Sequence, residues 1–115
     1  MPIFRLGTIN HAKGYVLNKL FEQGRIGGRH VPVGLIQGGY PPKWRHLIGS
    51  AIDSLRHEGL ILIRKKRTEG SYGLHASIVP SRLQDCRALI NAFRSGEGLG
   101  RVGRDMKTIL PIRSD

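Results

Sequence analysis

The chain has 115 residues, enough for one compact domain with at most a tail. Hydrophobic residues make up 39% of it, which supports a small core and excludes wholesale disorder. Nineteen Lys and Arg stand against eight Asp and Glu, and the resulting net charge of +11 favours a polyanionic partner, either a nucleic acid or an anionic membrane surface.

The sequence disfavours several other classes of protein. No apolar run approaches the roughly 20 residues that a membrane-spanning helix needs, which makes a membrane partner the weaker option. The single cysteine, Cys86, excludes an intramolecular disulfide and a multi-cysteine zinc site. Because MPIFRLGTINHAKGY lacks the apolar segment of a signal peptide, we expect a cytoplasmic protein.

Two helices are predicted in the first 40 residues. The first runs from Asn10, a plausible N-cap, to a stop at Gly24, and its apolar residues have helical spacing: Tyr15, Val16, Leu20 and Phe21. After a glycine-rich stretch, VPVGLIQ can form a short helix opened by Pro32 and closed by Gly38 and Gly39.

The strongest helical signal is WRHLIGSAIDSLRHEG. Its apolar residues draw one stripe along a helix: Trp44, Leu47, Ile48, Ala51, Ile52 and Leu55. The opposite face carries Arg45, His46, Gly49, Ser50, Asp53 and Arg56. Pro41 and Pro42 suit the entry to this helix, and Gly59 suits its C-terminal cap.

A β-hairpin is predicted next. LILIRKKR is an apolar run that becomes basic, SYGLHASIVP is a second strand-like run, and TEGS is a credible turn between them. The four consecutive cations from Arg64 to Arg67 therefore lie within a hairpin, which disfavours a basic tail or a targeting signal.

The last predicted helix spans residues 81–95. Its inward stripe consists of Leu83, Cys86, Leu89, Ile90 and Phe93, so Cys86 is expected to be a small core residue. Residues 96–115 are rich in Gly and Arg and are predicted to form an arm, in which MKTILPI has the character of a short strand. We therefore expect a domain over residues 1–95 and an arm over residues 96–115.

A short helix, a tight turn, a long helix and a basic hairpin, in that order, resemble the winged helix-turn-helix family. The resemblance covers roughly residues 10–80, and AIDSLRHEGLILIRKKR is its most specific part. It implies an α+β fold, a small winged-helix domain of three helices plus a β-hairpin wing, here with an added C-terminal helix. VPVGLIQGGYPP departs from the family by its many Gly and Pro residues, so the second helix is expected to be short or distorted.

The resemblance also implies a binding surface for duplex DNA. In this family the long helix enters the major groove with its N-terminal end first, and the matching positions here are Lys43, Arg45, His46, Gly49, Ser50 and Arg56. Arg45 could contact guanine in a bidentate manner, and Gly49 permits close backbone approach. The alternative is that these residues are only the solvated face of a surface helix.

The wing is expected to contact phosphates. Its basic residues are Arg64, Lys65, Lys66 and Arg67, of which about half would point the same way because side chains alternate along a strand. Tyr72 and His75 on the return strand could add a hydrogen bond or a stacking contact. The alternative is that these charges protect an exposed sheet edge from pairing.

Signals for catalysis or metal binding are weak. No pair of acidic residues lies beside a plausible nucleophile, and the five histidines have no short metal-ligand spacing. GRIGG and GEGLGRVG lack the strand–loop–helix setting of a phosphate-binding loop. We therefore expect no enzymatic activity, no cofactor and no metal.

The sequence thus predicts a DNA-binding protein, most simply a transcriptional regulator. An RNA-binding or ribosome-associated protein on the same fold is the main alternative, and a protein-interaction domain is disfavoured by the charge. A homodimer is also predicted, with the helix at 81–95 and the chain termini at the interface. Four apolar residues of that helix exceed what packing on a small hairpin domain needs: Leu83, Leu89, Ile90 and Phe93.

Overall fold

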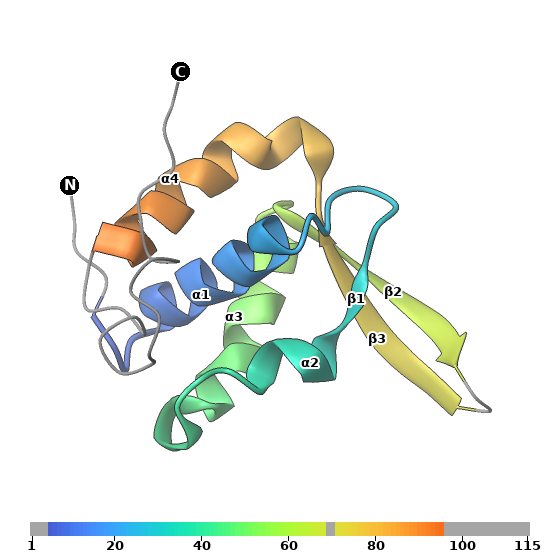
Figure 1. The fold of residues 1–115 in the computed structure, drawn as a ribbon, viewed down its shortest axis with the longest axis horizontal. Helices are drawn as coiled ribbons and strands as arrows, with labels where there is room; N and C mark the ends of the chain where they lie inside the picture. Colours follow the sequence, from blue (N-terminus) through green and yellow to red (C-terminus); the bar gives the residue numbers. More distant parts are fainter. Residues whose placement is uncertain (1–4, 69–70, 96–115) are drawn as a thin grey trace.

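The computed structural model describes residues 5–68 and 71–95, and within them four α-helices and three strands form one α+β domain (Figure 1). The helices are α1 (Ile9–Glu22), α2 (Val33–Gln37), α3 (His46–His57) and α4 (Leu83–Ser95). The strands are β1 (Val31–Pro32), β2 (Ile61–Thr68) and β3 (Ser71–Ile78), and 3-10 turns at Pro42–Trp44 and Pro80–Arg82 precede α3 and α4. This arrangement confirms the predicted fold class, three helices and a β-hairpin with an added C-terminal helix.

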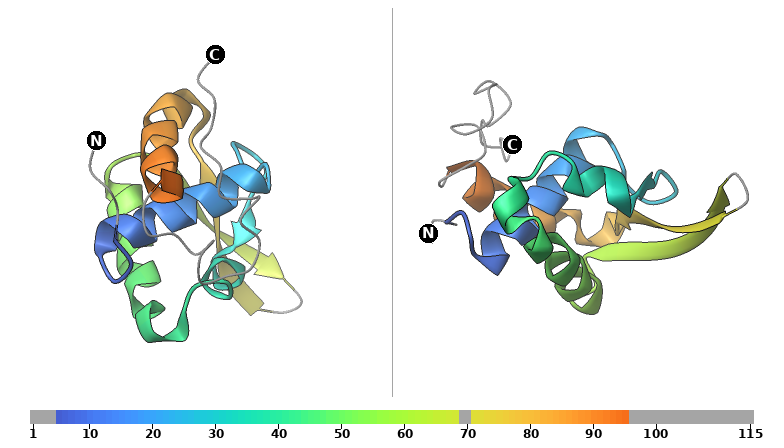
Figure 2. Two further views of the ribbon diagram at one scale, coloured as in Figure 1. Left: turned by 60° about the vertical axis from the view of Figure 1, so that its left-hand side comes forward. Right: turned by 90° about the horizontal axis from the view of Figure 1, so that it is seen from below.

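Helix α1 is the central element of the domain. It begins slightly earlier than predicted: Thr8, not Asn10, is the N-cap, and its hydroxyl accepts a hydrogen bond from the backbone N–H of His11 at 3.2 Å. The helix ends before Gly24, whose φ of +66° suits glycine. Helix α3 packs on one side of α1, and α4 covers the other side (Figures 1 and 2).

The three strands form an antiparallel sheet in the order β1–β3–β2. The predicted hairpin is confirmed, with pairing that runs from Ile61–Ile78 to Thr68–Ser71, and its turn falls in residues 69–70, outside the described residues. Strand β1 was not predicted, because two residues, one of them a proline, give no periodic signal. The hairpin projects away from the helices, as Figure 2 shows.

The predicted short helix is confirmed as α2. It follows Pro32 directly and is five residues long, with Gly38 as its C-cap. Only Ile36 of this helix is buried, whereas Leu35 is among the most exposed apolar side chains of the domain. Such a short helix depends on its neighbours for stability, because a single turn gains few intrahelical hydrogen bonds.

Helix α4 completes the core, and this finding corrects the predicted dimer interface. Ile90 and Phe93 are 0% and 1% exposed, while Leu83 and Leu89 pack partly buried against the same cluster. The number of apolar residues on α4 suggested an interface, but they are needed within the domain. Helix α1 is buried on both sides: α3 covers one side, and α4 covers the side that a three-helix domain would leave exposed. An interface through Ile90 and Phe93 is wrong, and the dimer itself stays a prediction without this support. The expected arm at 96–115 and both chain termini lie outside the described residues.

Candidate nucleic-acid interface

The solvent face of α3 forms as the sequence predicts. Ile48, Ala51 and Leu55 are buried in the core, and the opposite face exposes His46, Gly49, Ser50, Asp53 and Arg56. A side chain at Gly49 would meet no atom within 4 Å, so the helix surface there is open to an approaching ligand. The face therefore combines small, polar and basic residues around one acidic side chain.

Lys43 and Trp44 shape the approach to α3. Lys43 is exposed, and its Nζ lies 5.0 Å from the centre of the Trp44 ring, within the range of a cation–π contact. The indole is partly buried against the core, and a side chain on Gly7 would come within 3.1 Å of it. Trp44 is therefore held in packing, as predicted, and positions Lys43 just before the helix.

Arg45 is engaged by the protein itself. Its guanidinium donates hydrogen bonds to the backbone oxygens of Gln37 and Tyr40, each at 3.1 Å, and a longer one to Gly38 at 3.4 Å. These carbonyls belong to the last residue of α2 and to the turn that leads from it to α3. The contact with guanine stays a prediction, and it would require the side chain to leave these carbonyls, whereas the structure gives Arg45 a structural role.

A buried polar network supports the same turn from inside. The Tyr15 hydroxyl donates to the Ile36 carbonyl at 2.8 Å, and the Tyr40 hydroxyl lies 2.7 Å from Nδ1 of His11. A side chain on Gly39 would come 2.6 Å from the Tyr15 oxygen, so only glycine fits there. Burial raises the pKa of Tyr15 to about 12, so this hydroxyl keeps its proton and can act as a donor. Sequence reasoning missed the network because it counted Tyr15 only as apolar.

The hairpin presents part of the predicted basic cluster. Arg64 and Lys65 are exposed, and as neighbours in a strand they lie on opposite faces of the hairpin. Lys66, Arg67 and Tyr72 occupy paired positions of β2 and β3, and only their backbone is among the described parts of the chain.

His75 departs from its predicted role at the surface. It is only 6% exposed, and its Nδ1 lies 3.0 Å from Nδ1 of His30. A nucleic-acid base could therefore not stack on the His75 ring unless the residues that bury it moved away. Nothing in the sequence marked the pair, because 45 residues separate the two histidines.

Positive charge dominates the folded domain rather than the predicted arm. Residues 5–95 hold 15 Lys and Arg against five Asp and Glu, whereas residues 96–115 hold four against three. Each of the four acidic residues within the described part already pairs with a basic side chain: Lys13–Glu58 at 2.6 Å, Arg82–Asp85 at 2.7 Å, Arg94–Glu22 at 3.5 Å and Arg56–Asp53 at 3.9 Å. Among the described residues, basic side chains therefore far outnumber the carboxylates that could neutralise them.

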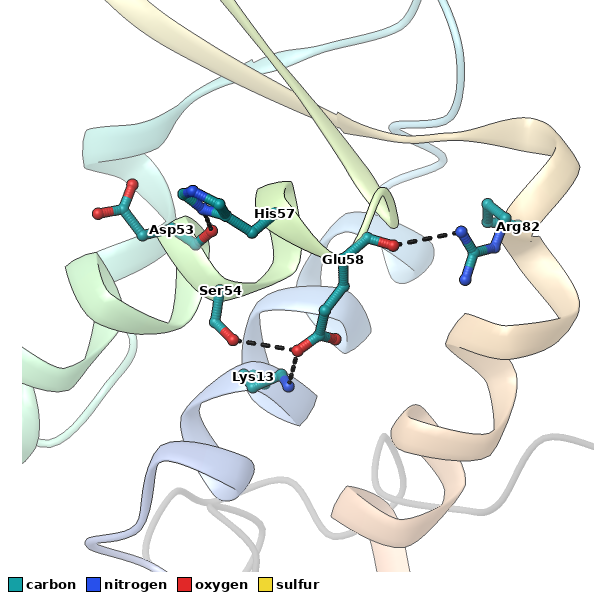
Figure 3. Close-up of polar contacts among 6 residues, drawn as sticks. All are labelled: Lys13, Asp53, Ser54, His57, Glu58 and Arg82. Atoms are coloured by element: carbon teal, nitrogen blue, oxygen red, sulfur yellow. Dashed lines mark hydrogen bonds and ion pairs between the residues drawn. The ribbon is translucent and has the colours of Figure 1, made fainter.

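Glu58, the C-cap of α3, links this helix to α1 and to the 3-10 turn before α4 (Figure 3). Its carboxylate accepts hydrogen bonds from Lys13 of α1 and from Ser54, and its backbone oxygen accepts one from Arg82 at 3.2 Å. Partial burial opposes ionisation of Glu58, but the hydrogen bonds from Lys13 and Ser54 outweigh it and hold its pKa below the ordinary value. These contacts fix the orientation of α3 on the domain.

Among the described residues, no helix is both long and apolar enough to span a membrane, and no group of three or more metal-ligating side chains occurs. Cys86 is fully buried, and burial raises the pKa of its thiol to about 11, which confirms it as a core residue.

The architecture, four helices and a three-stranded antiparallel sheet with a projecting hairpin, is compatible with a small winged-helix-like domain. The sequence matches no protein-family model, and comparisons with curated proteins and with solved structures find no significant match.

Proposed function

We propose that this protein binds duplex DNA through α3 and the β2–β3 hairpin, most simply as a small transcriptional regulator. The observation that carries the proposal is the location of the charge. The excess of basic residues belongs to the folded domain, and much of it lies on exposed segments that the domain's own carboxylates leave unneutralised. A polyanion supplies the missing negative charge along an extended surface.

In this proposal α3 lies in the major groove and the hairpin follows the backbone. Lys43, His46 and Ser50 are exposed on the first turns of α3 or just before it, and Gly49 leaves room for a base edge or a sugar. Arg64 and Lys65 contact phosphates and provide affinity without reading sequence. Arg45 acts indirectly, because it holds the turn that sets the position of α3 relative to α2.

Competition among ligands tests this proposal against the RNA alternative. The purified chain is titrated with a labelled duplex, and unlabelled duplex DNA, structured RNA and single strands compete at several salt concentrations. We expect duplex DNA to compete best and the affinity to fall steeply with salt. Stronger competition by structured RNA would replace DNA with RNA as the ligand, and an affinity that salt does not change would contradict both.

A further inference from the structure

A close pair of potential metal ligands lies at the base of the hairpin. His30 precedes β1, His75 lies in β3, and their Nδ1 atoms are 3.0 Å apart with the rings nearly perpendicular, at 82°. His75 is 6% exposed and His30 is half-buried. The rings approach through their Nδ1 atoms, which are lone-pair donors when unprotonated.

The spacing of the pair is close to that of two ligands of one metal ion. Two histidine nitrogens that bind one tetrahedral Zn²⁺ at about 2.0–2.1 Å lie about 3.3 Å apart. The Nδ1 atoms of His30 and His75, which share a hydrogen bond, are 3.0 Å apart. A small opening of the pair would therefore bring both nitrogens to coordination distance of one ion.

We propose that His30 and His75 form a two-histidine site for a divalent transition-metal ion such as Zn²⁺. Each ring binds the ion through Nδ1, and the ring that now donates its Nδ1 proton carries that proton on Nε2 instead. Because the described residues offer no third ligand of the usual kinds nearby, water or an anion completes the coordination. This proposal is independent of nucleic-acid binding.

Neighbouring charges limit the affinity of this site. Arg64 is the partner of His75 across the sheet, and Arg29 precedes His30 in the chain, so a cation is bound in a positive environment. We therefore expect binding weaker than in sites with three or four protein ligands. A bound ion would cross-link the segment before β1 to β3 and so stabilise the base of the hairpin.

Zinc binding by the full-length, tag-free chain tests the site. Equilibrium dialysis should find one Zn²⁺ per chain, and Zn²⁺ at about ten times its dissociation constant should raise the melting temperature by roughly 5–10 °C over the value in EDTA. His30→Gln should lose both effects, since it removes one ligand at a half-buried position. His57→Gln is the matched control, because His57 is exposed on α3 and should leave both effects unchanged.

A measurement on the unmodified chain covers the case in which His30→Gln does not fold. Paramagnetic Ni²⁺ at substoichiometric amounts should broaden the ring signals of His30 and His75 before those of His57. An absence of bound Zn²⁺, a zinc effect that persists in a folded His30→Gln variant, or preferential broadening of His57 would each overturn the proposal.

Discussion

Replacing Arg45 with alanine separates a structural role from a base-reading role. The change removes two hydrogen bonds of 3.1 Å and a weaker one of 3.4 Å from the turn between α2 and α3. A hydrogen bond from a charged donor contributes about 1.5–3 kcal/mol when its loss leaves a buried group unsatisfied. Gly38 and Gly39 are exposed, so water can reach part of this turn, and we expect a total loss of about 1–2 kcal/mol. For a domain of this size that lowers the melting temperature by roughly 5–15 °C.

The assay is thermal or urea unfolding followed by circular dichroism, with Arg56→Ala as the control. Arg56 is on the same helix, but its side chain is 54% exposed and its ion pair with Asp53 is 3.9 Å long, so its loss should change stability by less than about 0.5 kcal/mol. The structural interpretation is refuted if the Arg45→Ala variant is as stable as the wild type but discriminates less at one base pair of its DNA site. The guanidinium would then contact a base.

Three further experiments test other parts of the structure. Because the pKa of Glu58 is lowered in the fold, its contribution to stability is present above the unfolded pKa and is lost as the pH falls through the folded one. Lys13→Met should thus lower the free energy of unfolding by at most about 1 kcal/mol at neutral pH. Measured by urea titration, the difference in this free energy between the variant and the wild type should disappear below about pH 4.3, and a difference that does not change with pH would contradict this. Asp53→Asn removes an exposed carboxylate from α3 and should strengthen DNA binding about two- to fivefold at low salt, an effect that fades as salt rises; equal affinities would place α3 away from the phosphates. Ellman's reagent at about pH 8 should react with Cys86 only in denaturant, and rapid reaction of the folded chain would show that the thiol is not buried.

Local patterns in the sequence were enough to predict most of the fold. The stripe from Leu47 to Leu55 defined the buried side of α3, and the apolar runs on either side of TEGS defined the hairpin. These elements repeat one chemical type at a fixed spacing, which is information that lies within a few residues. Strand β1 and the Thr8 cap lacked such repetition, since one is two residues long and the other is a single side chain.

The candidate site was harder to predict because its details depend on contacts between distant segments. Arg45 belongs by spacing to the polar face of α3, yet its guanidinium turns to the carbonyls of the preceding turn. His75 lies in a strand that the sequence identified, but its ring is buried and contacts His30, which precedes β1. Spacing along one element shows which residues share a face, whereas the partner of a side chain is decided by how the elements pack.

DNA binding by two variants of equal charge tests the central claim most directly. One variant neutralises Arg64, Lys65, Lys66 and Arg67 in the hairpin, and the other neutralises Arg101, Arg104, Lys107 and Arg113 near the C-terminus; each has four fewer positive charges than the wild type. We predict that the hairpin variant binds all duplexes more weakly, with a salt dependence reduced by about 0.9 for each phosphate that the hairpin no longer neutralises, while the C-terminal variant stays close to wild type. Unchanged affinity and salt dependence in the hairpin variant, or a larger decrease in affinity for the C-terminal variant, would contradict the proposal that the folded domain binds DNA through its hairpin.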